Sequence, residues 1–297
     1  IIFGEPMASG WITPALPLVI GFFMTKGLFD QTYRVETFHY MSAMAIEFTL
    51  LVLILGLTGI GKLIVEKVPN GLKSGIILGA ALAAFYQIFF SDFDRYIGNA
   101  PVSMISALLI CTVTTFSEPF KRLAQKNKIL AVIGSLGLLP GFIVAAIVGY
   151  ITGEITWNIE WGLAVPAVVD VYKQTSPLSI GFPPAEMYLE VLPLVIIGYL
   201  LLFGDFVTAL EVIKEGQDKR PDEIIDIDIN RSHNSVGIRN AIGAIINPFF
   251  PTQGALWTGV HVVVIERWKQ GRKAMGSLFD GIHSYYLMGI PFLFFVV

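Results

Sequence analysis

Two apolar stretches, one near each end of the chain, are interrupted by glycine and proline at similar places. The first is Pro6–Pro17 (PMASGWITPALP), and the second is Pro248–Gly259 (PFFPTQGALWTG). Short, interrupted hydrophobic segments at corresponding positions of two halves are the best sequence indication of a secondary transporter's substrate site. An unwound backbone can lie at membrane depth only where it is buried in protein or lines a cavity. The pattern therefore predicts a membrane protein in which both stretches line a site.

The composition is that of an integral membrane protein. Hydrophobic residues make up 54% of the chain and charged residues 14%, whereas soluble domains carry about 25% charge. The net charge of −3 argues against a nucleic-acid partner, and we expect no cofactor and no metal. The single cysteine, Cys111, lies in an apolar run and is expected to pack within a helix. Because the chain opens on Ile1 and stops inside the apolar run 287–297, we expect it to be the internal part of a longer protein.

The hydropathy pattern predicts an all-α membrane fold of about nine spans, since a span needs roughly 20 apolar residues and fewer when the helix is broken. Residues 1–152 would belong to a first half, 153–186 to an extracellular connection and 187–297 to part of a second half. The second half would include a cytoplasmic loop, 216–234. The predicted spans are 6–24 (broken), 38–57, 71–90, 101–116, 129–151, 187–212, 236–250, 254–265 (broken) and 282–297 (cut off).

Basic residues follow every second predicted span, which by the positive-inside rule places those loops in the cytoplasm. Lys26 and Arg34 lie on the other side and weaken the pattern slightly. The loop 216–234 is polar and mixed in charge, and we interpret it as a solvated loop, with a regulatory element as the alternative. The basic residues that follow every second predicted span form four clusters: Lys62, Lys67 and Lys73; Lys121, Arg122, Lys126 and Lys128; Lys219, Arg220 and Arg231; and Arg267, Lys269, Arg272 and Lys273.

Asp205 is the sharpest candidate for chemistry, because ionisable groups inside spans are costly and functional by default. It follows Gly204 deep in a predicted span, and Thr208 shares its helix face. Asp205 could carry a coupling proton or hold a cation; the alternative is a structural acid bonded to a neighbour. Glu211 is a second predicted coupling acid, nearer the interface. For Glu47 we favour a structural role.

Small residues at the two interruptions predict the substrate site. If a half-helix begins at each, its free N–H groups and positive dipole end form a site for an anion or polar group. Trp11 and Trp257 could wall the cavity, and His261 is expected to be a packed, hydrogen-bonding residue. Metalloprotease, serine-hydrolase, nucleotide-binding and CxxC motifs are absent, so we do not expect an enzyme. The predicted substrate-binding residues are Ala8, Ser9, Gly10, Gln253, Gly254, Ala255, Trp257 and Thr258.

Three segments resemble nucleobase/ascorbate (xanthine/uracil) permeases. Gly204–Val212 (GDFVTALEV) is similar to the Gly-Asp…Glu-Val stretch of that family's eighth span. Asn240–Phe250 and the broken segment to Arg267 resemble the ninth and tenth spans, and Gly10–Pro14 resembles the start of the third. The whole chain would then cover spans three to about twelve.

The resemblance implies an inverted-repeat fold of the seven-plus-seven type, here truncated at both ends, whose two broken helices can carry short strands. A core domain would hold the substrate between the third and tenth spans, and would slide like an elevator against a gate domain. Sulfate-permease-like anion transporters share this plan. The resemblance further implies a homodimer formed through the gate domain and a bacterial inner (plasma) membrane.

The chain departs from the nucleobase pattern at the residues that read the base. The family's substrate-binding Glu, three residues before the Gly of the eighth span, is Leu201 here, and the polar pair of the tenth span corresponds to Thr258 and Gly259. We therefore expect a separate branch that takes a small polar or anionic solute, coupled to a proton or sodium. An uncoupled channel or facilitator for small anions is the alternative, and an intramembrane enzyme using Asp205, Glu211 and His261 is a third hypothesis.

Overall fold

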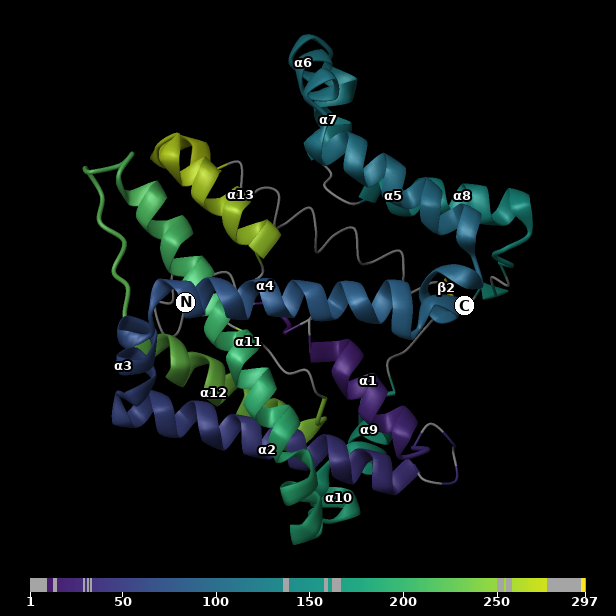
Figure 1. Cartoon of the computed structure of the whole chain (residues 1–297), viewed down its shortest axis with the longest axis vertical. Helices are drawn as coiled ribbons and strands as arrows, with labels where there is room; N and C mark the ends of the chain where they lie inside the picture. Colours follow the sequence, from purple (N-terminus) through teal and green to yellow (C-terminus); the bar gives the residue numbers. More distant parts are fainter. Residues whose placement is uncertain are drawn as a thin grey trace. The chain divides into compact units, whose positions relative to one another are not determined.

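The computed structural model describes residues 10–12, 15–28, 30, 32, 34–135, 139–157, 160–161, 167–249, 254, 258–276 and 295–296. The chain divides into two compact units. Unit 1 comprises Ile1–Leu82 and Val165–Ile290, and unit 2 comprises Ala83–Ala164 and Pro291–Val297. Both units are built almost entirely of helices (Figure 1), as the sequence predicts.

Unit 1 carries the two helices that are long and apolar enough to cross a membrane, α2 and α11. Its helices are α1 (Leu16–Thr25), α2 (Arg34–Thr58), α3 (Ile60–Lys67), α4 (Asn70–Tyr86, whose last residues belong to unit 2), α9 (Val168–Thr175), α10 (Pro177–Ile180), α11 (Ala185–Gln217), α12 (Ile229–Ile246) and α13 (Thr258–Lys269).

The ends of α2 and α11 follow from local sequence. Gly59 has φ 77° and so stops α2 in the left-handed conformation that favours glycine. Pro184 precedes α11, where its missing N–H is no loss. With 25 and 33 residues, both helices exceed the roughly 20 residues that a span needs. The predicted spans 38–57 and 187–212 fall inside them.

Helices α2 and α12 run side by side in unit 1 (Figure 1) and approach closely at glycines. A Cβ atom on Gly237 would lie 2.5 Å from Leu53 Cδ2 of α2, and one on Gly61, in the first turn of α3, would lie 2.7 Å from His233 Nε2 of α12. A Cβ on Gly56 would lie 2.8 Å from His233 Cβ. Glycine is therefore required at these three positions for the observed packing.

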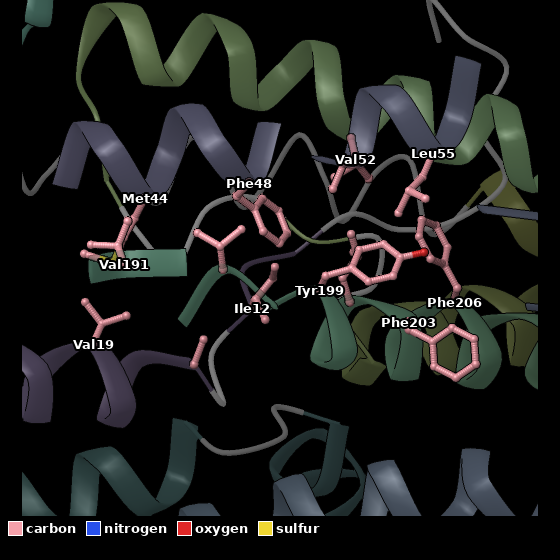
Figure 2. Packing of buried hydrophobic residues seen from close by; sticks show 14 of the residues in the cluster. Ile12, Val19, Met44, Phe48, Val52, Leu55, Val191, Tyr199, Phe203 and Phe206 are labelled. Carbon is pink, nitrogen blue, oxygen red and sulfur yellow. The ribbon is translucent and has the colours of Figure 1, made fainter. Parts of the chain in front are cut away.

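The core of unit 1 is mainly apolar but includes a buried polar pair, Tyr199 and His233. His233 is completely buried, its ring lies 4.4 Å from that of Phe206, and its Nδ1 donates to Ile229 O at 2.8 Å. The Tyr199 hydroxyl lies 3.2 Å from His233 Nε2 and donates to it, since Nδ1 carries the ring proton. Figure 2 shows the apolar part of this core, with Met44, Phe48, Val52 and Leu55 on α2 and Val191, Tyr199, Phe203 and Phe206 on α11.

Helix α12 differs from the predicted span 236–250. It begins earlier, after Asp228, whose side chain accepts from Asn230 N and Arg231 N, and it ends at Ile246. It is not among the helices apolar enough to cross a membrane by composition. Its polar side chains are buried against protein, so apolarity alone could not mark its start. The second broken segment also differs, because its helix, α13, runs Thr258–Lys269 rather than ending at 265.

The described residues of unit 2 are helical or irregular apart from one short strand pair. Its elements are the end of α4, the π-helices η3 (Gln87–Ser91) and η4 (Asp94–Gly98), α5 (Pro101–Phe116), α6 (Glu118–Lys126), α7 (Lys128–Ser135), α8 (Leu139–Thr152), β1 (Glu160–Trp161) and β2 (Phe295–Val296). The two strands pair antiparallel. Helices α5 and α8 pack together, and the Glu154 carboxylate accepts from Val102 N and Ser103 N at the start of α5.

Two bent helix pairs in unit 2 also have the composition of a span. Helix α6 follows α5 at 67°, and α8 follows α7 at 90°, which divides the predicted span 129–151. The described residues therefore hold two candidate membrane-spanning helices, or four if each bent pair counts as one. The predicted span 71–90 becomes α4 followed by η3. The predicted span 282–297 lies outside the described residues apart from β2.

Candidate functional site

The two interrupted stretches meet in unit 1. The backbone N–H of Gly254 donates to the carbonyl oxygen of Gly10 at 2.5 Å. Trp11 takes part in an isolated β-bridge, and its ring lies 5.4 Å from that of Phe249. Backbone groups that leave a helix inside a membrane protein need partners, and here the two interruptions supply one to each other.

Asp205 of α11 lies against this junction. A Cβ atom on Gly254 would lie 3.0 Å from Asp205 Oδ2, 2.9 Å from Ile12 Cγ1 and 3.4 Å from Gly10 O. Only a residue without a side chain fits at Gly254 while the carboxylate stays where it is. The junction of Gly10, Ile12, Gly254 and Asp205 is called the glycine junction below.

The carboxylate of Asp205 is half-buried, and in the described part of the chain no hydrogen-bond donor pairs with it. Thr208, which shares its helix face, donates instead to Gly204 O at 2.9 Å. A carboxylate that has no partner among the described residues and lies beside an unwound backbone has the chemistry to exchange a proton or to hold a cation.

A helix begins shortly after the junction residues of each interrupted stretch. Helix α1 starts at Leu16, four residues beyond Ile12, and α13 starts at Thr258, four residues beyond Gly254. Helix N-termini carry unpaired N–H groups and a positive dipole end. In α1, Pro17 lies in the first turn and contributes no N–H.

Other predicted site residues lie elsewhere. The Glu211 side chain is 67% exposed and pairs with Lys214 at 2.8 Å, a pairing typical of a solvated helix surface. His261 is completely buried and hydrogen-bonds to the backbone of Ala209, as expected of a packed histidine. The Oε2 atom of Glu47 is buried with no hydrogen-bond partner in the described part of the structure.

Several predicted binding residues lie outside the described residues. They are Ala8, Ser9, Gln253, Ala255 and Trp257, and for Thr258 only the backbone at the start of α13 is described. Among the residues that are described, no three His, Cys, Asp or Glu side chains gather as metal ligands would.

Sequence reasoning missed the contacts that hold α1 beside the junction. Lys26, just after α1, pairs with Glu190 Oε2 of α11 at 2.5 Å. The Tyr40 hydroxyl of α2 donates to the same oxygen at 2.8 Å. Ile12 was missed as well, although it is completely buried against Gly254. Lys26 stood out only as a basic residue on the wrong side, and nothing in one sequence pairs it with a glutamate so far along the chain.

Comparison with known proteins adds no family. No protein-family model matches the sequence, and a search of curated proteins finds no match. The class that the fold defines is therefore a helical protein with at least two helices long and apolar enough to cross a membrane. In this protein, two interrupted segments meet beside the acidic side chain of Asp205.

Proposed function

We propose that this chain belongs to a secondary active transporter for a small polar or anionic solute, coupled to a proton or sodium. The observation that carries the proposal is the hydrogen bond between Gly254 and Gly10 with Asp205 against it. Contacting broken segments with a nearby acid are the features by which such transporters hold a solute and a coupling ion.

The division into units supports an elevator-type transporter. Unit 1 contains both interrupted stretches together with α2, α11 and α12, and would be the core that the resemblance implies. Unit 2 contains α5 to α8 and the segment 291–297, and would be the gate. Chain segments far apart in sequence thus group as a core and a gate would.

The charges suggest how solute and proton would be coupled. The two helix N-termini favour an anion, whereas an ionised Asp205 beside them would repel one. An anion and a proton on Asp205 would therefore bind together, and this mutual enhancement is the coupling that a symporter needs. If sodium is the coupling ion, the ionised carboxylate would bind it instead.

The first experiment is thermal stabilisation of the full-length protein by nucleobases, dicarboxylates, sulfate and bicarbonate at two pH values. A ligand that binds the folded state raises its stability by mass action. Stabilisation by anions alone would assign the junction to an anion, and stabilisation by uracil or xanthine would show that other groups replace the missing carboxylates.

The coupling role is tested in proteoliposomes with the stabilising solute. Asp205→Asn should abolish uptake driven by a pH or sodium gradient while solute exchange continues. Asp218→Asn, at the exposed end of the same helix, is the matched control and should behave as the wild type. Full coupled uptake in Asp205→Asn would refute the assignment, and wild-type flux that ignores both gradients would indicate an uncoupled channel.

A further inference from the structure

The connection between α11 and α12 was expected to be a solvated loop, yet it contains a buried arginine. Arg220 is 8% exposed. Its Nε and NH2 atoms donate to the two carboxylate oxygens of Asp222 at 2.7 and 2.9 Å, and NH2 also donates to Glu223 Oε2 at 2.8 Å. The bond from Arg220 lowers the pKa of Asp222 and so keeps that acid ionised.

The same guanidinium reaches the far end of α13. Arg220 NH1 donates to Trp268 O at 2.6 Å, and the guanidinium carbon lies 5.0 Å from the centre of the Trp268 ring. Nearby, Lys269 pairs with Glu215 of α11 at 2.9 Å. A planar guanidinium can satisfy carboxylates, a carbonyl and an aromatic face at once, which a lysine cannot.

Contacts between α11 and α13 continue from this end toward the glycine junction. A Cβ on Gly216 would lie 2.6 Å from Ile265 Cγ2, so the two helices are in close contact there. His261 then bonds to the backbone of Ala209, and Gly254 lies against Asp205. Residue numbers rise together along both helices, which therefore pack in parallel (Figure 1). From Asp205 to Gly216 the rise is about 16 Å at about 1.5 Å per residue.

We propose that Arg220 is a positioning residue, which sets the register between α11 and α13 and thereby the placement of Asp205 against Gly254. This inference rests on the proposed function in one respect: that function is what makes the placement of Asp205 against Gly254 important. The register itself can be tested without any transported solute.

The test uses dicyclohexylcarbodiimide, an apolar reagent that modifies protonated carboxyl groups in apolar surroundings. The rate of Asp205 modification in the full-length protein is followed by peptide mass spectrometry over a series of pH values. Arg220→Ala is expected to change this rate by about 2- to 30-fold at one or more pH values of the series. This is the usual size of the effect when a residue is coupled to a distant site. Arg220→Lys keeps the charge but not the fork of donors, so it should change the rate less.

Two controls separate positioning from general loosening. Arg231→Ala removes an arginine in the first turn of α12, one that pairs with Asp226 of the connection, and should leave Asp205 modification unchanged. Glu47, on α2 in the same unit, provides an internal reference, because general loosening would alter its modification as well.

Wild-type modification of Asp205 in both Arg220 variants would overturn the proposal. An equal change in Arg231→Ala, or a parallel change at Glu47, would overturn it too. If Arg220→Ala does not fold, the rate of Asp205 modification in Arg220→Lys, compared with the wild type, decides the test. This test does not measure transport. A changed rate of Asp205 modification would therefore support the positioning role of Arg220 even if Asp205→Asn kept coupled uptake. The two proposals can thus fail separately.

Discussion

Replacing Gly254 by alanine is the sharpest test of the glycine junction. The added methyl group would lie 2.9 Å from Ile12 Cγ1 and 3.0 Å from Asp205 Oδ2, both closer than ordinary contact. Ile12 is completely buried, so it cannot turn out toward solvent without leaving the core. The φ angle at Gly254 is not positive, so the backbone itself would accept alanine. The change in stability therefore depends on the steric conflict of the new methyl group with Ile12 and Asp205.

Two opposing effects set the size of the change. Overpacking a filled site costs about 1–3 kcal/mol, whereas replacing glycine at a permitted conformation returns about 0.4–1 kcal/mol by restricting the unfolded chain. The net expectation is a destabilisation of about 0–2.6 kcal/mol, or a fall in melting temperature of up to about 10 °C at about 2–4 °C per kcal/mol. The affinity of whichever solute stabilises the protein should fall as well, since Asp205 must shift.

The measurement is thermal unfolding of purified variants in one detergent. Gly243→Ala is the matched control: it lies inside α12 with nothing within 4 Å of the new Cβ, and it should gain about 0.5–1 kcal/mol. Ile12→Ala removes the blocking atom, so the double variant should be more stable than the sum of the single changes by at least about 0.5 kcal/mol. A Gly254→Ala protein as stable as Gly243→Ala, with additive behaviour toward Ile12→Ala, would refute the described junction.

Two further predictions concern stability. Tyr199→Phe removes the hydroxyl that donates to His233 and leaves a buried acceptor unpaired, so unfolding should become easier by about 1–3 kcal/mol, measured by chemical denaturation; no change would mean that the bond is not formed. For Glu154, desolvation favours the neutral acid, but hydrogen bonds from Ser103 and Val102 outweigh it and lower the pKa. This stabilisation is present above the usual value of 4.5 and lost as pH falls through the lower folded value. The melting temperature of Glu154→Gln should therefore lie below that of the wild type at neutral pH and approach it in acid, and a gap that widens in acid would contradict this.

The sequence predicts some parts of this fold well, because their signals are local. The apolar runs of α2 and α11 exceed the length of a span, and the interruptions at Gly10 and Gly254 indicate where backbone leaves a helix. Ser117 caps α6 with Pro119 in its first turn, a helix-start signal. That signal is present in the sequence, although the basic residues after it predict a loop.

Other parts depend on pairings that one sequence does not contain. His233 and Asn240 make α12 look like a poor membrane segment, since hydropathy cannot tell whether a helix faces lipid or protein. In the sequence, Arg220 is one of several charged residues in a polar loop, and only the structure shows that its guanidinium lies over the Trp268 ring. Of the two coupling acids predicted for α11, only Asp205 is brought to the junction. The exposure of Glu211 depends on helix rotation, which a nearly uniform apolar sequence leaves open.

The contacts between α2 and α12 have a consequence for sequence variation. Leu53 occupies the space that any side chain at Gly237 would need, and His233 does the same for Gly61. A homologue with alanine at either glycine should therefore carry a smaller partner, so that positions 53 and 237, like positions 61 and 233, change together. The paired changes at positions 53 and 237 would trace the close approach of α2 and α12, and those at positions 61 and 233 the approach of α3 and α12, through sequences too distant to align by their apolar spans.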